Sequence, residues 1–162
     1  NTMKNRFALT RFANVAHSNG SVLPFWLKLK EEGKTLKLTS KYMNRLMFSK
    51  SDASKLINKA INKCDTDGGG FVCSYKMKSV NMFELAKVIS DDVKVVGLRP
   101  GEKLDEDLIS VREIPFTYIH DDMIYIYNQE NLDENKLKQG YSSVSAEKMT
   151  KEEMEELVWN TK

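Results

Sequence analysis

The sequence has few of the residues that build disulfide-stapled or metal-bound proteins. It contains two cysteines, Cys64 and Cys73, and two histidines, His17 and His120, and these four do not stand at the spacing of metal ligands. Two cysteines do not make a disulfide framework, so we interpret them as free thiols in a reducing cytoplasm. A structural zinc site and a disulfide-rich secreted domain are therefore excluded.

The sequence also lacks a large excess of positive or negative charge, and it has no long apolar run. The 162 residues carry 25 Lys and Arg against 23 Asp and Glu, and this net charge of +2 leaves no large electrostatic footprint for nucleic acid. No apolar run approaches the length of a transmembrane helix, and no signal-peptide pattern opens the sequence. We therefore expect a cytoplasmic protein that binds neither nucleic acid nor a membrane.

The spacing of apolar residues predicts a mixed α/β fold. Helical spacing is found over 22–32, from Ser49 or Ser51 onward, around 82–89, and from Thr150, where Glu153 completes a capping box. Strands are predicted over 7–13, 35–39, 71–74 and 93–98, and a hairpin joins 116–119 to 123–127. The second helix is expected to bury Ala53, Leu56, Ile57, Ala60 and Ile61, and the third Met82, Leu85, Ala86 and Ile89.

A run of three glycines, Gly68 to Gly70, raises the question of a phosphate-binding loop. Such loops join a strand to a helix, whereas this run follows a predicted helix and precedes a strand. The aspartates just before it do not make a calcium loop, because Lys76 stands at the twelfth position, where Glu is needed. The run is therefore interpreted as a flexible connection.

The most informative stretch is the end of the 93–98 strand and the turn Arg99-Pro100-Gly101. A guanidinium presented on a tight turn suits phosphate oxygens, and Glu102, at the start of a predicted short helix, can accept hydrogen bonds from sugar hydroxyls. The simpler alternative is an Arg–Glu surface pair around an ordinary turn.

Three further polar residues are candidates for either a structural or a functional role. Asn14 ends a predicted strand, where binding residues of open α/β sheets often lie, although an Asn there also commonly forms a turn. Arg45, taken by itself, is a surface arginine. His17, in the loop after Asn14, has a role beside a ligand as its less favoured alternative.

Several motifs stand in the order in which a known family has them. They are Arg-Phe-Ala-Asn-Val at 11–15, Gly-Ser-Val-Leu-Pro at 20–24, Met-Asn-Arg-Leu at 43–46, Arg-Pro-Gly-Glu-Lys-Leu at 99–104 and Tyr-Ser-Ser at 141–143. With them the chain resembles the C-terminal half of the polysaccharide-biosynthesis UDP-N-acetylglucosamine 4,6-dehydratases, which are extended short-chain dehydrogenases. It departs from the family pattern at Phe12, Ala13, Asn19 and Asp105.

The resemblance implies a fold and a domain plan. We expect the substrate-binding portion of such an enzyme, a short mixed sheet with flanking helices, without the Rossmann half that binds the dinucleotide. Residues 1–162 would form this single domain, with 1–15 as the remnant of the last Rossmann strand and 141–162 as a C-terminal tail helix.

The resemblance also implies roles for particular residues. Asn14 and the backbone of Ser21 and Val22 would meet the sugar of a UDP-sugar. Arg45 and Arg99 would clamp its diphosphate, and Glu102 would bind its ribose hydroxyls.

The family's chemistry needs parts that this sequence lacks. These dehydratases use a tightly held NADP(H) to oxidise C4 of the sugar, and the glycine loop and the Tyr-x-x-x-Lys pair belong to their N-terminal half. No tyrosine here has a lysine four residues later. We therefore expect the chain alone to bind no cofactor, to hold no catalytic residue and to be inactive.

Partners follow from the same resemblance. We expect a UDP-sugar as ligand, self-association, and a nucleotide-binding half that either lies on a separate chain or is missing from this sequence. The alternative is a non-catalytic interaction or assembly module that has lost sugar-nucleotide binding.

Overall fold

The computed structural model describes residues 6–130 and 136–160, and these form the mixed α/β fold that was predicted. The strands are β1 (Ala8–Thr10), β2 (Asn14–Val15), β3 (Leu36–Leu38), β4 (Asn44–Phe48), β5 (Phe71–Tyr75), β6 (Ser79–Asn81), β7 (Val93–Val95), β8 (Asp107–Ile109), β9 (Thr117–His120), β10 (Met123–Tyr127) and β11 (Tyr141–Ser142). The helices are α1 (Val22–Glu31), α2 (Lys50–Asp67), α3 (Met82–Ile89), the 3-10 helix η1 (Val111–Phe116) and α4 (Lys151–Trp159).

The strands form small sheets. The largest has the order β1-β5-β10-β9, in which β1 runs parallel to β5 and the other neighbours are antiparallel. The predicted hairpin is confirmed as β9 and β10. The remaining sheets have the orders β2-β4-β6, β3-β7 and β11-β8.

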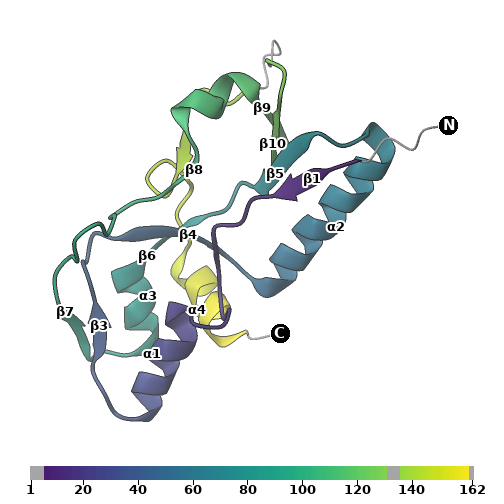
Figure 1. The fold of residues 1–162 in the computed structure, drawn as a ribbon. Helices are drawn as coiled ribbons and strands as arrows, with labels where there is room; N and C mark the ends of the chain where they lie inside the picture. Colours follow the sequence, from purple (N-terminus) through teal and green to yellow (C-terminus); the bar gives the residue numbers. More distant parts are fainter. Residues whose placement is uncertain (1–5, 131–135, 161–162) are drawn as a thin grey trace.

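Two hydrophobic cores share one strand, β4. Helices α1, α3 and α4 gather with β3 and β7 around one core, while α2 lies along β1 and β5 beside the other (Figure 1). Side chains of a strand alternate between its faces, so Met47 enters the first core and Leu46 and Phe48 enter the second. β4 therefore fixes how the two halves of the molecule meet.

The structure confirms the predicted helix start that has a capping box and the predicted buried face that has a complete apolar stripe. Thr150 and Glu153 form the predicted capping box of α4. The four predicted residues of α3 are all buried. On α2 only Leu56 and Ala60 are fully buried. The prediction for Ile57 and Ile61 was wrong: these side chains belong to neither core and are 43% and 52% exposed.

The glycine run joins α2 to β5, as predicted. The structure explains why one of its positions, Gly69, has no side chain. A Cβ atom on Gly69 would collide with the backbone of Phe7, and Gly70 N–H donates to the Phe7 carbonyl at 2.6 Å. The run therefore lets the chain entering β1 pass directly against the connection between α2 and β5.

Two local predictions were wrong. The strand predicted over 7–13 ends at Thr10, and the chain then changes sheet before β2. The short helix predicted after Gly101 is absent from the described residues, where 99–106 forms turns and bends. The backbone N–H of Asn44 and the guanidinium of Arg45 bind the carbonyls of this segment, which a helix would have used internally.

An ion pair fastens η1 to the end of β1. Arg11 Nη2 donates to Glu113 Oε1 at 2.7 Å, and both side chains are less than one third exposed. The hydrogen bond from Arg11, with those from the Ser110 backbone and hydroxyl, lowers the pKa of Glu113 to about 2. Glu113 thus takes part both in the capping box of η1 and in the ion pair with Arg11.

We expect this pKa to make the stability depend on pH. Because Glu113 has an ordinary pKa of 4.5 in the unfolded chain and about 2 in the folded one, its contribution is present above pH 4.5 and is lost as the pH falls toward 2. Glu113→Gln should lower the free energy of unfolding at pH 7 by about 1 kcal/mol, or roughly 2–4 °C in Tm. Thermal unfolding between pH 7 and 3 measures this. Glu155→Gln, at an exposed position of α4, is the control, and equal acid sensitivity of the wild type and Glu113→Gln would refute the assignment.

Apolar side chains are exposed at the β1 edge of the β1-β5-β10-β9 sheet. Phe7 and Leu9, which share a face, are 70% and 65% exposed, and among the described residues β1 has a strand on one side only. An unpaired edge strand with exposed apolar residues favours pairing with another chain.

We expect the wild-type chain to self-associate through this edge. Leu9→Lys should reduce association at high concentration, measured by light scattering, because a charge on an edge strand opposes pairing. Val144→Lys, at a position 64% exposed outside this sheet, should associate like the wild type. A wild-type chain that stays monomeric at high concentration would contradict the expectation.

Candidate functional site

A cavity of about 640 Å³ opens where β2, α1, β3 and β4 meet the turn after β7. It brings together five of the six residues predicted to bind a ligand: Asn14, Ser21, Val22, Arg45 and Glu102. The apolar part of its lining consists of Trp26, Met43, Met47 and Met82. Residues from widely separated parts of the sequence therefore meet at one hollow of the surface.

Ser21 is the residue of this cavity whose polar atom most needs a partner. It is the N-cap of α1, yet its hydroxyl caps no backbone N–H, and the buried Oγ has no hydrogen-bond partner among the described residues. A buried hydroxyl without a partner costs free energy, and the first N–H groups of a helix lack partners within it. The start of α1 therefore offers hydrogen bonds toward the cavity.

Glu102 also lines the cavity. Its Oε1 accepts from the Thr39 hydroxyl at 2.9 Å and its Oε2 from the backbone N–H of Arg99 at 3.2 Å. The backbone hydrogen bond from Arg99, then the one from Thr39 and the charges of Arg99 and Arg45, lower the pKa of Glu102. The carboxylate is therefore ionised at neutral pH and accepts hydrogen bonds.

Arg99 is the sixth predicted residue, and the structure places it beside the cavity and not in its lining. The turn that carries it has Gly97 and Gly101 at φ angles of 96° and 81°, which favour glycine. Its side chain is exposed, and within the described parts of the chain its guanidinium makes no hydrogen bond or ion pair. Arg99 is thus an uncommitted cation next to Glu102.

Arg45, in contrast, is largely committed within the protein. Its Nη1 donates to the carbonyls of Asn44 and Leu104 at 2.8 and 2.9 Å, and its Nη2 donates to that of Lys103 at 2.8 Å. Its Nε lies 3.2 Å from Glu106 Oε1, and the side chain is only 13% exposed. Three of the five N–H donors of this guanidinium are therefore used by backbone carbonyls, and the Nε side is ion-paired with Glu106.

Sequence reasoning missed two residues at this site, Thr39 and Glu106. Glu106 bridges Arg45 and Asn14, since Asn14 Nδ2 donates to Glu106 Oε2 at 3.2 Å and to the Leu46 carbonyl at 3.0 Å. Glu106 lies only two residues past the motif at 99–104, but no spacing rule connects it with Asn14. The contact exists only because β2, β4 and the segment before β8 converge.

His17 does not take the ligand-side role that the sequence left as an alternative. Its ring Nε2 lies 3.0 Å from the carbonyl of Leu157 on α4, and it is not among the residues that line the cavity. It connects the loop before α1 to the end of the last helix.

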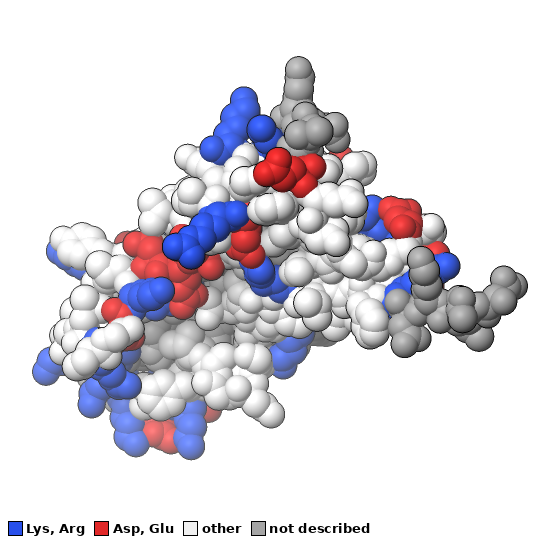
Figure 2. All heavy atoms as spheres, turned by 45° about the horizontal axis from the view of Figure 1, so that its top comes forward, with Lys and Arg blue, Asp and Glu red and all other residues white. Residues whose placement is uncertain are grey.

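Surface charge does not single out another site. On the face drawn in Figure 2, Lys and Arg side chains lie interspersed with Asp and Glu, in line with the small net charge. Within residues 6–130 and 136–160, no cluster of three His, Cys, Asp or Glu residues could hold a metal ion. Over the same residues no helix has both the length and the apolar character to cross a membrane.

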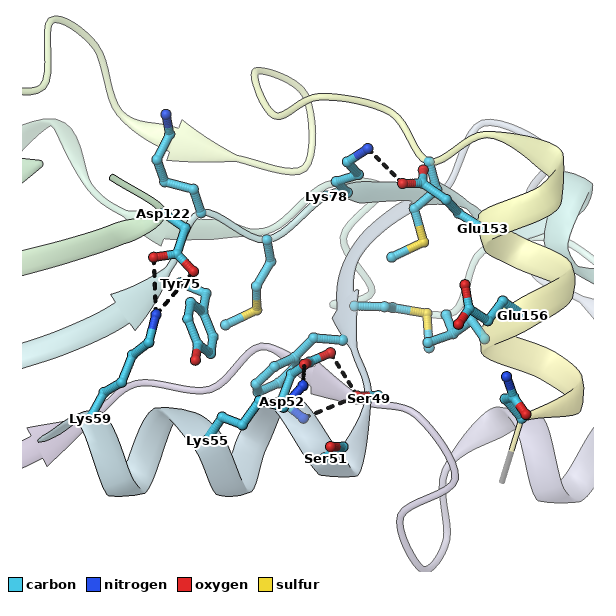
Figure 3. Close-up of a pocket in the computed structure, with 17 residues that line it drawn as sticks. Ser49, Ser51, Asp52, Lys55, Lys59, Tyr75, Lys78, Asp122, Glu153 and Glu156 are labelled. Carbon is cyan, nitrogen blue, oxygen red and sulfur yellow. Dashed lines mark hydrogen bonds and ion pairs between the residues drawn. The ribbon is translucent and has the colours of Figure 1, made fainter. Parts of the chain in front are cut away.

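A second cavity, of about 780 Å³, lies between α2 and α4 (Figure 3). Charged side chains on its rim pair with one another: Lys59 with Asp122 at 3.1 Å, Lys78 with Glu153 at 2.7 Å, and Lys55 with Asp52 at 3.2 Å. Most charges of this cavity are paired, whereas the cavity beside Ser21 contains a buried hydroxyl without a partner among the described residues. We therefore take the cavity at the start of α1 as the candidate site.

Comparisons with known proteins agree on the family. Residues 1–128 match the family model described as "Polysaccharide biosynthesis protein". The chain is 32% identical over 170 residues to an uncharacterized membrane protein of Methanocaldococcus jannaschii, covering 96% of this chain and 50% of that protein. It is 36% identical over 116 residues to the UDP-N-acetylglucosamine 4,6-dehydratase (inverting) of Campylobacter jejuni, covering 70% of this chain and 34% of the enzyme.

A solved structure shares the fold. Pen from Bacillus thuringiensis superposes with a TM-score of 0.81 at 26% identity, over 96% of this chain and 50% of that one. The chain thus spans half or less of the length of the relatives named here. It belongs to the polysaccharide biosynthesis protein family, within the extended short-chain dehydrogenases, and corresponds to the C-terminal half of such proteins.

Proposed function

We propose that this chain is the substrate-binding portion of a UDP-sugar 4,6-dehydratase of polysaccharide biosynthesis, and that it binds a UDP-N-acetylglucosamine-type nucleotide sugar in the cavity at the start of α1. One observation carries the proposal. A single cavity contains a buried hydroxyl without a partner, an ionised carboxylate and an amide, with an uncommitted arginine at its edge. These groups suit a ligand that has both a diphosphate and several hydroxyls.

The cation and the carboxylate would bind different parts of the ligand. The exposed guanidinium of Arg99 can form a bidentate contact with a diphosphate, to which Arg45 adds the positive charge of a mostly buried guanidinium. Glu102 repels phosphate and accepts from hydroxyls, so it would bind the ribose diol. The backbone N–H of Arg99 donates to Glu102, so the carboxylate lies against the turn that carries the guanidinium.

The sugar would lie toward β2 and α1. The Ser21 hydroxyl and the backbone at Val22 would supply hydrogen bonds there, and Asn14, the first residue of β2, lines the same cavity. Trp26, whose indole N–H donates to the Lys37 carbonyl at 3.3 Å, keeps the wall between α1 and β3 in place. This part of the cavity is therefore polar at its ends and apolar between them.

The residues of this chain do not fit the nicotinamide dinucleotide of the longer enzymes. A dinucleotide binds at a glycine-rich turn from a strand to a helix. The glycine run here leads from α2 into β5, and Gly69 is packed against Phe7. We therefore assign binding of the nucleotide sugar to this chain and derive no redox step from it.

Ligand-specific effects of Arg99 and Glu102 test the proposal. Arg99→Ala should weaken UDP and UDP-N-acetylglucosamine alike and barely change uridine, and Arg99→Lys should recover part of the loss. Glu102→Gln should weaken every ribose-containing ligand, uridine included, and leave pyrophosphate unaffected. Losing a charge-assisted hydrogen bond costs about 1.5–3 kcal/mol, so tenfold to hundredfold weaker binding is expected by ligand-observed NMR.

Arg112→Ala provides the matched control, because Arg112 is an exposed arginine of η1 away from the cavity. It should bind all four ligands like the wild type. If the wild type shows neither binding nor heat stabilisation with UDP-sugar, the chain is instead the interaction module. If it binds UDP and both substitutions leave every affinity unchanged, the residue assignment fails.

A further inference from the structure

Glu106 contacts two residues of the cavity, Asn14 and Arg45, although it does not line the cavity itself. Its two carboxylate oxygens are divided between them, with Oε1 3.2 Å from Arg45 Nε and Oε2 3.2 Å from Asn14 Nδ2. The side chain is 44% exposed, so it approaches the pair from the solvent side. One carboxylate therefore holds an amide and a guanidinium in a fixed relation.

The backbone of Glu106 is itself fixed by a buried serine from the C-terminal segment. Ser143 is 0% exposed, its hydroxyl accepts from the N–H of Glu106 at 3.0 Å, and its N–H donates to the Glu106 carbonyl at 2.9 Å. The same hydroxyl donates to Asp105 Oδ1 at 3.0 Å. This segment lies beyond residue 128, where the family match ends, so residues outside that match determine where Glu106 lies.

The contact decides which hydrogen bonds Asn14 can still make. Its amide nitrogen has two hydrogens, and these are used by the Leu46 carbonyl and by Glu106. What remains on the side chain is the oxygen Oδ1, which can only accept. Asn14 therefore meets a ligand as an acceptor and suits a hydroxyl or an amide N–H of the ligand.

The contact also limits Arg45. Three of its N–H groups donate to backbone carbonyls, and its Nε is ion-paired with Glu106. Rotation of the guanidinium would break several of these bonds together.

We propose that Glu106 is a positioning residue of the nucleotide-sugar site, which holds the Asn14 amide so that its oxygen accepts a hydrogen bond from the sugar and holds Arg45 beside the diphosphate. The proposal rests on the proposed function for its ligand. Its structural part, the orientation of Asn14 by Glu106, can be observed without any ligand.

Glu106→Gln tests it with almost no change in shape. A glutamine is uncharged and has one acceptor oxygen, so it cannot both accept from Asn14 Nδ2 and keep the ion pair with Arg45. Either one contact is lost or the Asn14 amide turns over. The side-chain NH₂ signals of Asn14 in a ¹⁵N–¹H spectrum, identified by their loss in Asn14→Leu, should shift. Binding of UDP-N-acetylglucosamine to the 162-residue chain should weaken about tenfold.

Asp107→Asn is the matched control, because it removes the same charge one residue away, where within the described parts of the chain the side chain has no hydrogen bond or ion pair. It should leave both the Asn14 signals and the affinity unchanged. Unshifted Asn14 signals in Glu106→Gln, or shifted signals with wild-type affinity, would overturn the positioning role. A wild type that does not bind the nucleotide sugar would refute the proposed function, while the Asn14 signals would still decide whether Glu106 orients the amide.

Discussion

The arrangement of the site depends on one buried guanidinium, that of Arg45. It binds the carbonyls of Lys103 and Leu104 and so ties the segment after the Arg99 turn to β4. Without it the Lys103 carbonyl would lose this partner, and the Leu104 carbonyl would keep only the backbone N–H of Asn44. The same segment carries Glu102, which lines the cavity and accepts from the Thr39 hydroxyl. Arg45 is thus needed for the shape of the site whether or not it touches the ligand.

The position of the cavity follows from the way the two cores share β4. Its walls come from α1 and β3, which pack in one core, and from β2, whose Val15 packs against the other. A seam between two cores is lined by residues that neither core can bury fully, and polar side chains are tolerated there. This explains how an unpartnered hydroxyl, a carboxylate and an amide come to lie together without weakening either core.

Much of this could be predicted from the sequence, and the failures have physical causes. The apolar stripe of α3 and the cap of α4 are local signals, and both predictions were confirmed. The short helix after Gly101 was wrong because distant donors on β4 take the carbonyls that it needed. Glu106 was missed because its partners lie 92 residues away at Asn14 and on another strand at Arg45. The predicted roles of the site residues stay predictions, although five of the six do line one cavity.

The central claim is that a nucleotide sugar binds at the start of α1 and not between α2 and α4. A titration of the ¹⁵N-labelled chain with UDP-N-acetylglucosamine, followed through backbone amide shifts, separates the two cavities most directly. The account predicts that the shifts concentrate at 18–22, at Thr39 and at 99–102, while Ser51, Lys55 and Glu156 stay unchanged. Shifts confined to the cavity between α2 and α4, or no shifts at millimolar ligand, would contradict it.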